Sequence, residues 1–192
     1  INHEKPDLLV PRERCLTVRE RMSATGEVLI GLEDAAAEGL IRDIDASGAE
    51  AVAICLLHSY ANDAHEHALA DALRKNYPAM HVSLSSELVA LPREYERALS
   101  TVINAYVAPK MSSYLQALKE EVDPARLLIM DSAGGLMPPE RAIHEPVHTI
   151  VSGPAGGVRG AWDVGQRLGR SSLLSLDMGG TSTDISVIHG RM

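Results

Sequence analysis

The stretch 174-LSLDMGGTSTDISVIHGRM-192 places two acidic residues, a pair of glycines and three consecutive hydroxyl residues between two short apolar runs. Both runs have the length of a strand, and a Gly-Gly pair is common where two strands turn back on each other. The stretch therefore predicts a β-hairpin, in which Asp177 closes the first strand and Asp184 opens the second.

The turn of this hairpin carries more polar groups than a turn requires. Gly179 and Gly180 permit positive φ and let backbone N–H groups approach an anion, and Thr181 adds a hydroxyl donor. Amides around an anion beside a carboxylate suit a phosphate with its Mg²⁺. A P-loop is excluded, because the stretch has no GxxxxGK[ST] pattern and a strand follows it. A plain tight turn is the alternative, but it does not require Asp before the glycines and TSTD after them.

Composition limits the class of protein. The 192 residues carry a net charge of −8, which argues against a nucleic-acid or anionic-membrane surface. No apolar run approaches the roughly 20 residues that span a bilayer, and no secretory signal is present. Cys15 and Cys55 are expected to be buried free thiols, which fits a reducing cytoplasm. Because the chain opens with Ile1 and stops just after the predicted hairpin, we expect a piece of a longer protein.

The first part of the chain predicts a βαβ unit. A strand-turn-strand around Gly26 and a helix at 32–48 precede an apolar strand at 50–57. A helix at 63–77 follows, with Asp63 as its cap and Glu66 in capping-box position, and the next strand is predicted at 81–88. Strand, helix and strand in this order predict two parallel strands.

The second part begins with a long helical segment at about 92–122, which Pro109 is expected to break or kink. Tyr95, Leu99, Val102 and Tyr106 recur at helical spacing and predict its buried face. A linker at 122–126, a strand at 126–131, a helix capped by Ser152 and the closing hairpin complete the chain. The predicted class is thus α/β.

Several motifs resemble known families. DMGGTSTD (177–184) resembles the DxGGTxxD phosphate loop of the actin-like ATPase superfamily. SGPAGGVRGA (152–161) resembles the hydantoinase A/5-oxoprolinase family together with four other motifs in the same order: LLHSYANDAHEHALADAL (56–73), VSLSSEL (82–88), REYERALSTVINAYVAP (93–109) and DSAGGLMPPERA (131–142). The likeness covers essentially the whole chain. One departure is that Ala98 and Leu99 stand where the family usually has a Thr-Ser pair.

The resemblance implies an actin-like, ribonuclease-H-like ATPase fold, of which this chain is an internal fragment. Residues 1–122 would be the later part of the family's N-terminal domain, and residues 123–192 the start of its ATPase domain. The implied function is that of the A subunit of an ATP-dependent cyclic amidase, working with a B subunit. ATP would phosphorylate the carbonyl oxygen of a lactam or hydantoin, and water would then open the ring. The alternatives are an acetone-carboxylase-like subunit, a small-molecule kinase, and a non-enzymatic module that uses ATP as a switch.

Site residues follow from the motifs and the resemblance. Asp177 is predicted to hold Mg²⁺, directly or through water, and Asp184 to orient the hairpin or a water molecule. Phosphate oxygens are predicted to be bound by residues of the hairpin and of the helix N-terminus: Gly179, Gly180, Thr181, Ser152, Gly153 and Gly156. For the helix, an ordinary cap with glycines that permit close packing is an equal alternative.

Two arginines and four histidines complete the candidates. Arg93 and Arg97 in REYER are expected either to lie in a solvated first turn or to hold an anionic group of the substrate. A histidine metal site is disfavoured, because His65 and His67 point to different faces of a helix and Pro146 separates His144 from His148.

Overall fold

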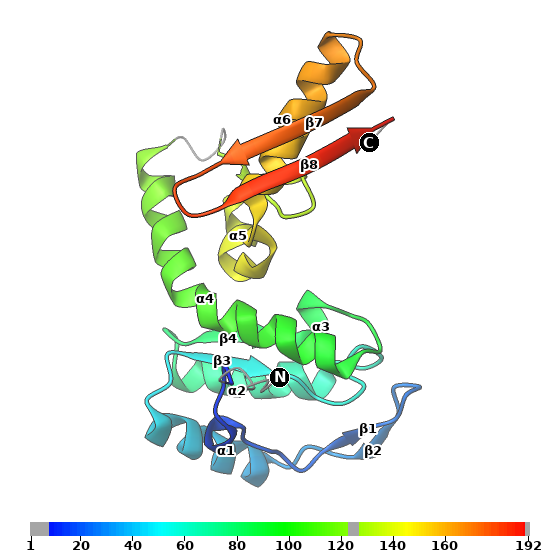
Figure 1. The fold of residues 1–192 in the computed structure, drawn as a ribbon. Coiled ribbons are helices and arrows are strands. Elements are labelled where there is room, and N and C mark those ends of the chain that lie inside the picture. Colours follow the sequence, from blue (N-terminus) through cyan, green and yellow to red (C-terminus); the bar gives the residue numbers. More distant parts are fainter. Residues whose placement is uncertain (1–7, 123–126, 191–192) are drawn as a thin grey trace, which may run out of the picture. The chain divides into compact units, whose positions relative to one another are not determined.

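The computed structural model describes residues 8–122 and 127–190 of the chain. They separate into two units, Ile1–Lys110 and Met111–Met192, whose elements are labelled in Figure 1. Helices accompany four two-stranded sheets in the described residues, which confirms the α/β class. The predicted linker lies mostly at 123–126, outside the described residues.

The predicted βαβ unit is the centre of the first unit. Strand β3 (Ala51–Ile54) is followed by α2 (Ala64–Asn76) and β4 (His81–Leu84). The two strands pair in parallel, from Ala51 opposite His81 to Ile54 opposite Leu84. The parallel pairing predicted from the strand-helix-strand order is therefore confirmed.

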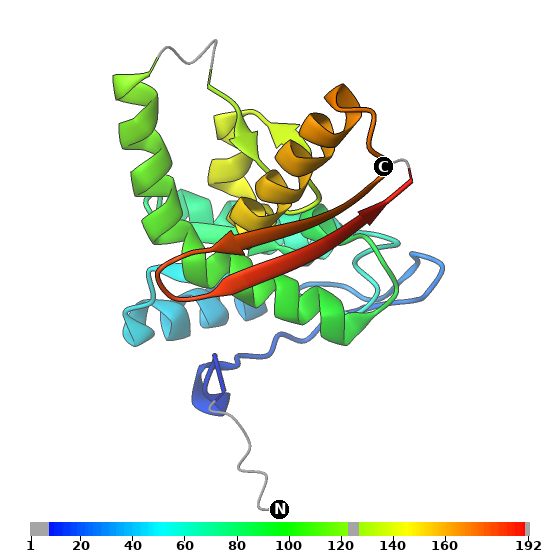
Figure 2. The same ribbon diagram turned by 45° about the horizontal axis from the view of Figure 1, so that its top comes forward.

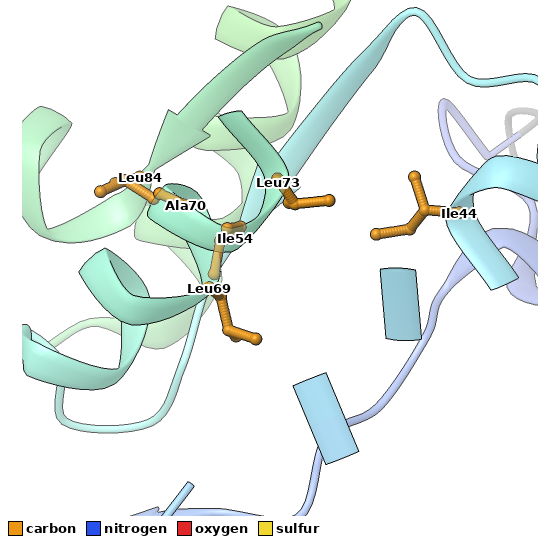
Figure 3. Packing of buried hydrophobic residues seen from close by; sticks show 6 residues of the cluster. All are labelled: Ile44, Ile54, Leu69, Ala70, Leu73 and Leu84. Carbon is orange, nitrogen blue, oxygen red and sulfur yellow. The ribbon is translucent and has the colours of Figure 1, made fainter. Parts of the chain in front are cut away.

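An aliphatic core joins α2 to the strands and to α1 (Asp34–Ser47). Figure 3 shows its side chains, with Leu69, Ala70 and Leu73 of α2 next to Ile54 of β3. Ile44 of α1 and Leu84 of β4 complete the buried cluster. Burial of these side chains, each contributing about 1.5–3 kcal/mol when large, holds the unit together.

The predicted capping box at the start of α2 is wrong. Asp63 is the N-cap but makes no side-chain hydrogen bond to the helix, and Glu66 is fully buried instead of reaching back to the cap. The carboxylate of Glu66 accepts hydrogen bonds from Leu56 N (2.8 Å), Ser85 Oγ (2.6 Å) and Ser86 N (2.9 Å). Glu66 therefore joins the ends of β3 and β4, because those donors satisfy its charge better than one exposed cap amide.

The remaining elements of the first unit lie before α1 and directly after β4. A short 3-10 helix, η1 (Arg12–Arg14), precedes the antiparallel hairpin of β1 (Arg21–Met22) and β2 (Val28–Ile30). Gly26 turns this hairpin at φ 86°, and Gly48 ends α1 at φ 64°, both as expected. A one-turn helix, α3 (Ser85–Leu88), follows β4, so the second half of the strand predicted at 81–88 is wrong. Both cysteines are free, but Cys15 is exposed and Cys55 half-buried, so the prediction of two buried thiols is wrong.

The long helix α4 (Glu94–Glu121) continues through Pro109, so of the predicted break or kink at this proline the break is wrong. Its predicted buried face is wrong, because Tyr95 and Tyr106 are 75% and 69% exposed. The buried residues of α4 in the first unit recur at helical spacing and are largely polar: Arg97, Thr101, Asn104, Ala105 and Ala108. The polar members have partners, such as Ser83 Oγ for the Asn104 amide (2.9 Å), which hydrophobic periodicity does not register.

The described residues of the second unit form the C-terminal part of α4, two antiparallel hairpins and helices α5 and α6. Strands β5 (Ile129–Met130) and β6 (Leu136–Met137) precede α5 (Pro139–His144) and the 3-10 helix η3 (Pro146–Thr149). Helix α6 (Ser152–Arg167) then leads into β7 (Ser172–Met178) and β8 (Thr183–His189). Figure 2 shows α6 lying along the β7–β8 hairpin. No helix within the described ranges is both long and apolar enough to cross a membrane.

Candidate functional site: the closing hairpin and helix α6

The closing hairpin forms as predicted and brings the two acids together. Strands β7 and β8 are antiparallel, with Asp177 directly opposite Asp184 and Met178 opposite Thr183. Side chains of directly paired residues lie on the same face of a sheet, so both carboxylates point to one side at the turn end of the hairpin. Asp177 is exposed and Asp184 half-buried, and among the described residues neither makes an ion pair.

The four-residue turn presents free donors. The Gly179 N–H donates to the Ser182 carbonyl oxygen (2.9 Å), which closes the loop. Within the described part of the chain, the N–H groups of Gly180 and Thr181 have no such partner. Contrary to expectation, neither glycine uses positive φ. The surroundings of Gly180 are open, since an added Cβ there would meet nothing within 4 Å.

Helix α6 covers the face of the hairpin that carries the acids. A Cβ added to Gly157 would lie 3.5 Å from Asp177 Oδ2, so this carboxylate lies against the N-terminal half of α6. Gly165 allows the other end of the helix to approach β7, because a Cβ there would overlap Leu173 Cδ1. Close packing through the glycines of SGPAGG was one of the two alternatives, and the position of Gly157 agrees with it. Sequence reasoning missed Gly165, although the repeated glycines between 152 and 165 were the available signal.

The start of α6 differs from the prediction. Ser152 is the first helical residue instead of the cap, and the N-cap is Val151 at φ 56°, ψ 23° without a side-chain cap hydrogen bond. A β-branched residue in the left-handed region is strained. Gly153 has open space around it, and a Cβ at Gly156 would reach Met130 at ordinary contact distance, 3.6 Å. The first turn of α6 therefore leaves its backbone amides uncovered by a capping side chain, at the positive end of the helix dipole.

The DSAGG turn (131–135) directly follows Met130, which lies next to Gly156 of α6. The carboxylate of its Asp131, however, already accepts hydrogen bonds within the turn. Asp131 Oδ1 accepts hydrogen bonds from Ala133 N (2.8 Å) and Gly135 N (2.9 Å). The carboxylate thus stabilises its own turn, and Asp177 and Asp184 are the acids left for a ligand.

The residues fit a magnesium-bound phosphate. No group of three His, Cys, Asp or Glu side chains in the described residues could hold a metal ion alone. Mg²⁺ in phosphate sites usually takes one or two carboxylates together with phosphate oxygens and waters, which is the donor set that Asp177 and the turn amides can supply.

The two candidate arginines, Arg93 directly before α4 and Arg97 within it, belong to the first unit and differ sharply in exposure. The Arg93 side chain is 73% exposed, and its Nη1 lies 3.6 Å from Glu96 Oε1. Arg97 is fully buried, and its Nη2 donates to the Leu56 carbonyl oxygen (2.6 Å). The predicted exposure to solvent is thus found for the Arg93 side chain but not for the Arg97 side chain.

Comparison with known proteins agrees with the motifs. A model of the hydantoinase/oxoprolinase family matches residues 97–192, and a model of the family's N-terminal region matches residues 2–77. The caprolactamase subunit alpha of Pseudomonas jessenii is 33% identical over 189 residues, which cover 95% of this chain and 27% of that protein. The acetone carboxylase beta subunit of Xanthobacter autotrophicus is 33% identical over 199 residues, covering 99% and 28%.

A solved structure extends the likeness to the fold. The crystal structure of the ATP-dependent caprolactamase from Pseudomonas jessenii superposes with a TM-score of 0.84 at 32% identity, over 97% of this chain and 28% of that chain. The chain thus spans between a quarter and a third of the length of these relatives. The matches confirm the resemblance read from the motifs: the chain belongs to the hydantoinase/oxoprolinase family.

Proposed function

We propose that the full-length protein is the A-type subunit of an ATP-dependent amidase that opens cyclic amides. The observation that carries the proposal is the pairing of Asp177 with Asp184 at a turn with free amides, beside the start of α6. The family match supports it, and so does the ATP dependence of the related caprolactamase.

The hairpin would bind the phosphates of ATP. Gly180 and Thr181 would donate to phosphate oxygens, while Gly179 would mainly hold the turn, since its N–H is bonded to Ser182. The first-turn amides of α6, from Ser152 and Gly153 with Gly156 close behind, would stabilise a further anionic oxygen. Such fixed donors favour a transferring phosphoryl group because they need no reorganisation during the reaction.

The two acids would have different tasks. Asp177 would hold Mg²⁺, directly or through water, and when bound this ion would neutralise charge on the phosphates. Asp184, half-buried and paired opposite Asp177, would keep the turn end of the hairpin in place or orient a water molecule.

A cyclic amide is the proposed substrate because such an amide is a poor electrophile. Transfer of the terminal phosphoryl group of ATP to the carbonyl oxygen, with ADP leaving, would make the carbonyl carbon electrophilic. Water could then add to that carbon, the C–N bond would break with a proton going to the ring nitrogen, and hydrolysis of the resulting acyl phosphate would give the ring-opened acid and phosphate. We propose that the protein works with a B subunit in the cytoplasm. Residues 1–122 would belong to its N-terminal domain, and residues 123–192 to its ATPase domain. Arg93 and Arg97 stay predicted contacts to an anionic group of the substrate.

A second candidate is a subunit of a ketone carboxylase. The likeness to the acetone carboxylase beta subunit, at 33% identity over nearly the whole chain, favours it. The phosphate site described above serves either reaction, so the products must separate them.

The test is an ATP-hydrolysis assay of the full-length protein with its partner subunit. Caprolactam, 5-oxoproline, hydantoin, and acetone with bicarbonate are offered in parallel, and products are identified by mass spectrometry. The proposal expects ring-opened acids and ATP hydrolysis that depends on a cyclic amide. A carboxylated ketone without any ring opening would support the second candidate, and ATP hydrolysis independent of every substrate would contradict both.

A further inference from the structure

A buried polar cluster lies at the carboxyl ends of β3 and β4, where ligands commonly bind to parallel sheets. Its centre is Arg97 of α4, which is fully buried. Nη2 of Arg97 donates to the Leu56 carbonyl oxygen (2.6 Å) and lies 3.7 Å from Cys55 Sγ. The Tyr60 ring lies over the guanidinium, with its centroid 5.5 Å from Cζ.

The guanidinium is only partly satisfied. Nε and Nη1 of Arg97 are buried and have no hydrogen-bond partner among residues 8–122 and 127–190. Buried donors without acceptors are costly, and the cost is larger for a charged group. A guanidinium held in this way is therefore prepared for an acceptor that the described residues do not provide.

The nearest acid of the cluster is not that acceptor. Both carboxylate oxygens of Glu66 are occupied by Leu56 N, Ser85 Oγ and Ser86 N. The Leu56 N–H thus donates to Glu66, while the Leu56 carbonyl oxygen accepts from Arg97. Among the described residues, Arg97 therefore remains a buried positive charge with two unpaired nitrogen atoms, next to the Cys55 thiol and the Tyr60 ring.

We propose that Arg97 binds a carboxylate group of a small molecule at this site. A carboxylate offers two acceptor oxygens to the guanidinium and one negative charge to its single positive charge. A phosphate dianion would leave an uncompensated charge in a buried site, so the carboxylate is favoured. The inference rests on the proposed function only for the source of this group, because opening a cyclic amide creates a carboxylate and 5-oxoproline already carries one.

Residues 55–63 connect β3 to α2 and include Cys55, Leu56 and Tyr60, which contact Arg97. His58 in this segment has φ 62°, and its Nδ1 lies 3.3 Å from the Tyr60 hydroxyl. A non-glycine residue in the left-handed region is uncommon, and strained residues of this kind cluster where chains bind ligands.

The test is ¹H–¹⁵N NMR of the arginine Nε–H groups in the full chain. The Arg97 signal is identified by its disappearance from the spectrum of R97K. If that variant does not fold, the signal is assigned by through-bond correlation to the assigned backbone of the wild type. Sodium acetate is titrated at constant ionic strength, with acetamide as the uncharged control of the same shape and inorganic phosphate as the dianion. The internal control is Arg93, an exposed arginine directly before α4.

The site predicts a saturable shift of the Arg97 signal with acetate, no shift with acetamide, and no saturable shift of Arg93. An absent response to acetate, or equal linear shifts of Arg93 and Arg97, would overturn the proposal. A response to phosphate alone would overturn the choice of a carboxylate. Because the titration contains no ATP, failure of the amidase assay leaves its result unaffected.

A second titration separates the two sources of the carboxylate. The probes are 5-oxoproline, the uncharged lactam 2-pyrrolidinone, and 4-aminobutyrate, the acid formed when that lactam opens. A shift with 5-oxoproline supports recognition of a substrate carboxylate, and a shift with 4-aminobutyrate supports recognition of the product. A shift with 2-pyrrolidinone as strong as with the two acids would contradict the site.

Discussion

Replacement of the buried Glu66 by Gln tests the network that joins β3, β4 and α2. The carboxylate accepts three hydrogen bonds, from Leu56 N, Ser85 Oγ and Ser86 N. Glutamine keeps one oxygen for Leu56 and Ser85, but its amide nitrogen then faces the Ser86 N–H, so two donors oppose each other. The substitution is nearly isosteric, and the effect is therefore that of charge and hydrogen bonding.

The magnitude follows from the contacts that change. A hydrogen bond to a charged group contributes about 1.5–3 kcal/mol, and leaving a buried donor unsatisfied costs about 1–3 kcal/mol. Loss of one such bond and weakening of the other two predict that E66Q lowers the free energy of unfolding by about 2–4 kcal/mol.

The assay is equilibrium urea unfolding of the full chain at pH 7, followed by circular dichroism. The matched control is E87Q, because Glu87 is an exposed glutamate on α3, directly after the Ser86 that Glu66 binds. We expect the control to change stability by less than about 0.5 kcal/mol. If E66Q unfolds at the same urea concentration as E87Q, the buried carboxylate does not hold the strand ends together and the reasoning is refuted.

Two further predictions concern alkaline pH and helix packing. Burial raises the pKa of Tyr77, and a hydrogen bond to Asp45 raises it further, so Tyr77 should ionise at higher pH than the exposed tyrosines in an absorbance titration. Because the pKa of Tyr77 is higher in the folded than in the unfolded state, the stabilisation by its protonated hydroxyl is complete below about pH 10 and is lost as the pH rises further. Y77F has no ionisable hydroxyl, so its free energy of unfolding should fall less above pH 10 than that of the wild type. On α6, G165V should lower stability by about 1–3 kcal/mol in thermal unfolding, because its side chain would overlap Leu173. The control G160V has open space and should be tolerated, and equal effects of the two substitutions would contradict close packing at Gly165.

The elements that the sequence predicts well are those whose signals are local. The hairpin around Gly179 and Gly180, the helix ended by Gly48 and the parallel βαβ unit all form where the pattern places them. Apolar runs, turn residues and short separations determine these elements, so no distant contact is needed to recognise them.

The failures share a different physical origin. Arg97 is buried on the face of α4 opposite to the predicted one, since its partner Leu56 lies 41 residues away. Glu66 does not cap its helix, because it accepts hydrogen bonds from donors up to 20 residues away in the sequence. A hydrophobicity pattern assigns polar residues to the surface, and only the tertiary structure reveals that these have buried partners.

The candidate site likewise has one feature that the sequence predicts and another that only the structure reveals. The opposed positions of Asp177 and Asp184 follow from the hairpin pattern alone. The contact between Asp177 and α6 at Gly157 required the structure, because it depends on how a helix packs across a sheet.

The central claim is that the closing hairpin binds the phosphates of ATP through a magnesium ion held by Asp177. The most direct measurement is the affinity of the full-length protein for ATP by isothermal titration calorimetry, with and without Mg²⁺. Wild type, D177N and the control D163N are compared, since Asp163 is an exposed residue of α6 that pairs with Arg167. We predict that Mg²⁺ tightens ATP binding in wild type and D163N, and that D177N loses about tenfold or more of this gain, or about 1.4 kcal/mol. An unchanged response to Mg²⁺ in D177N would contradict the claim.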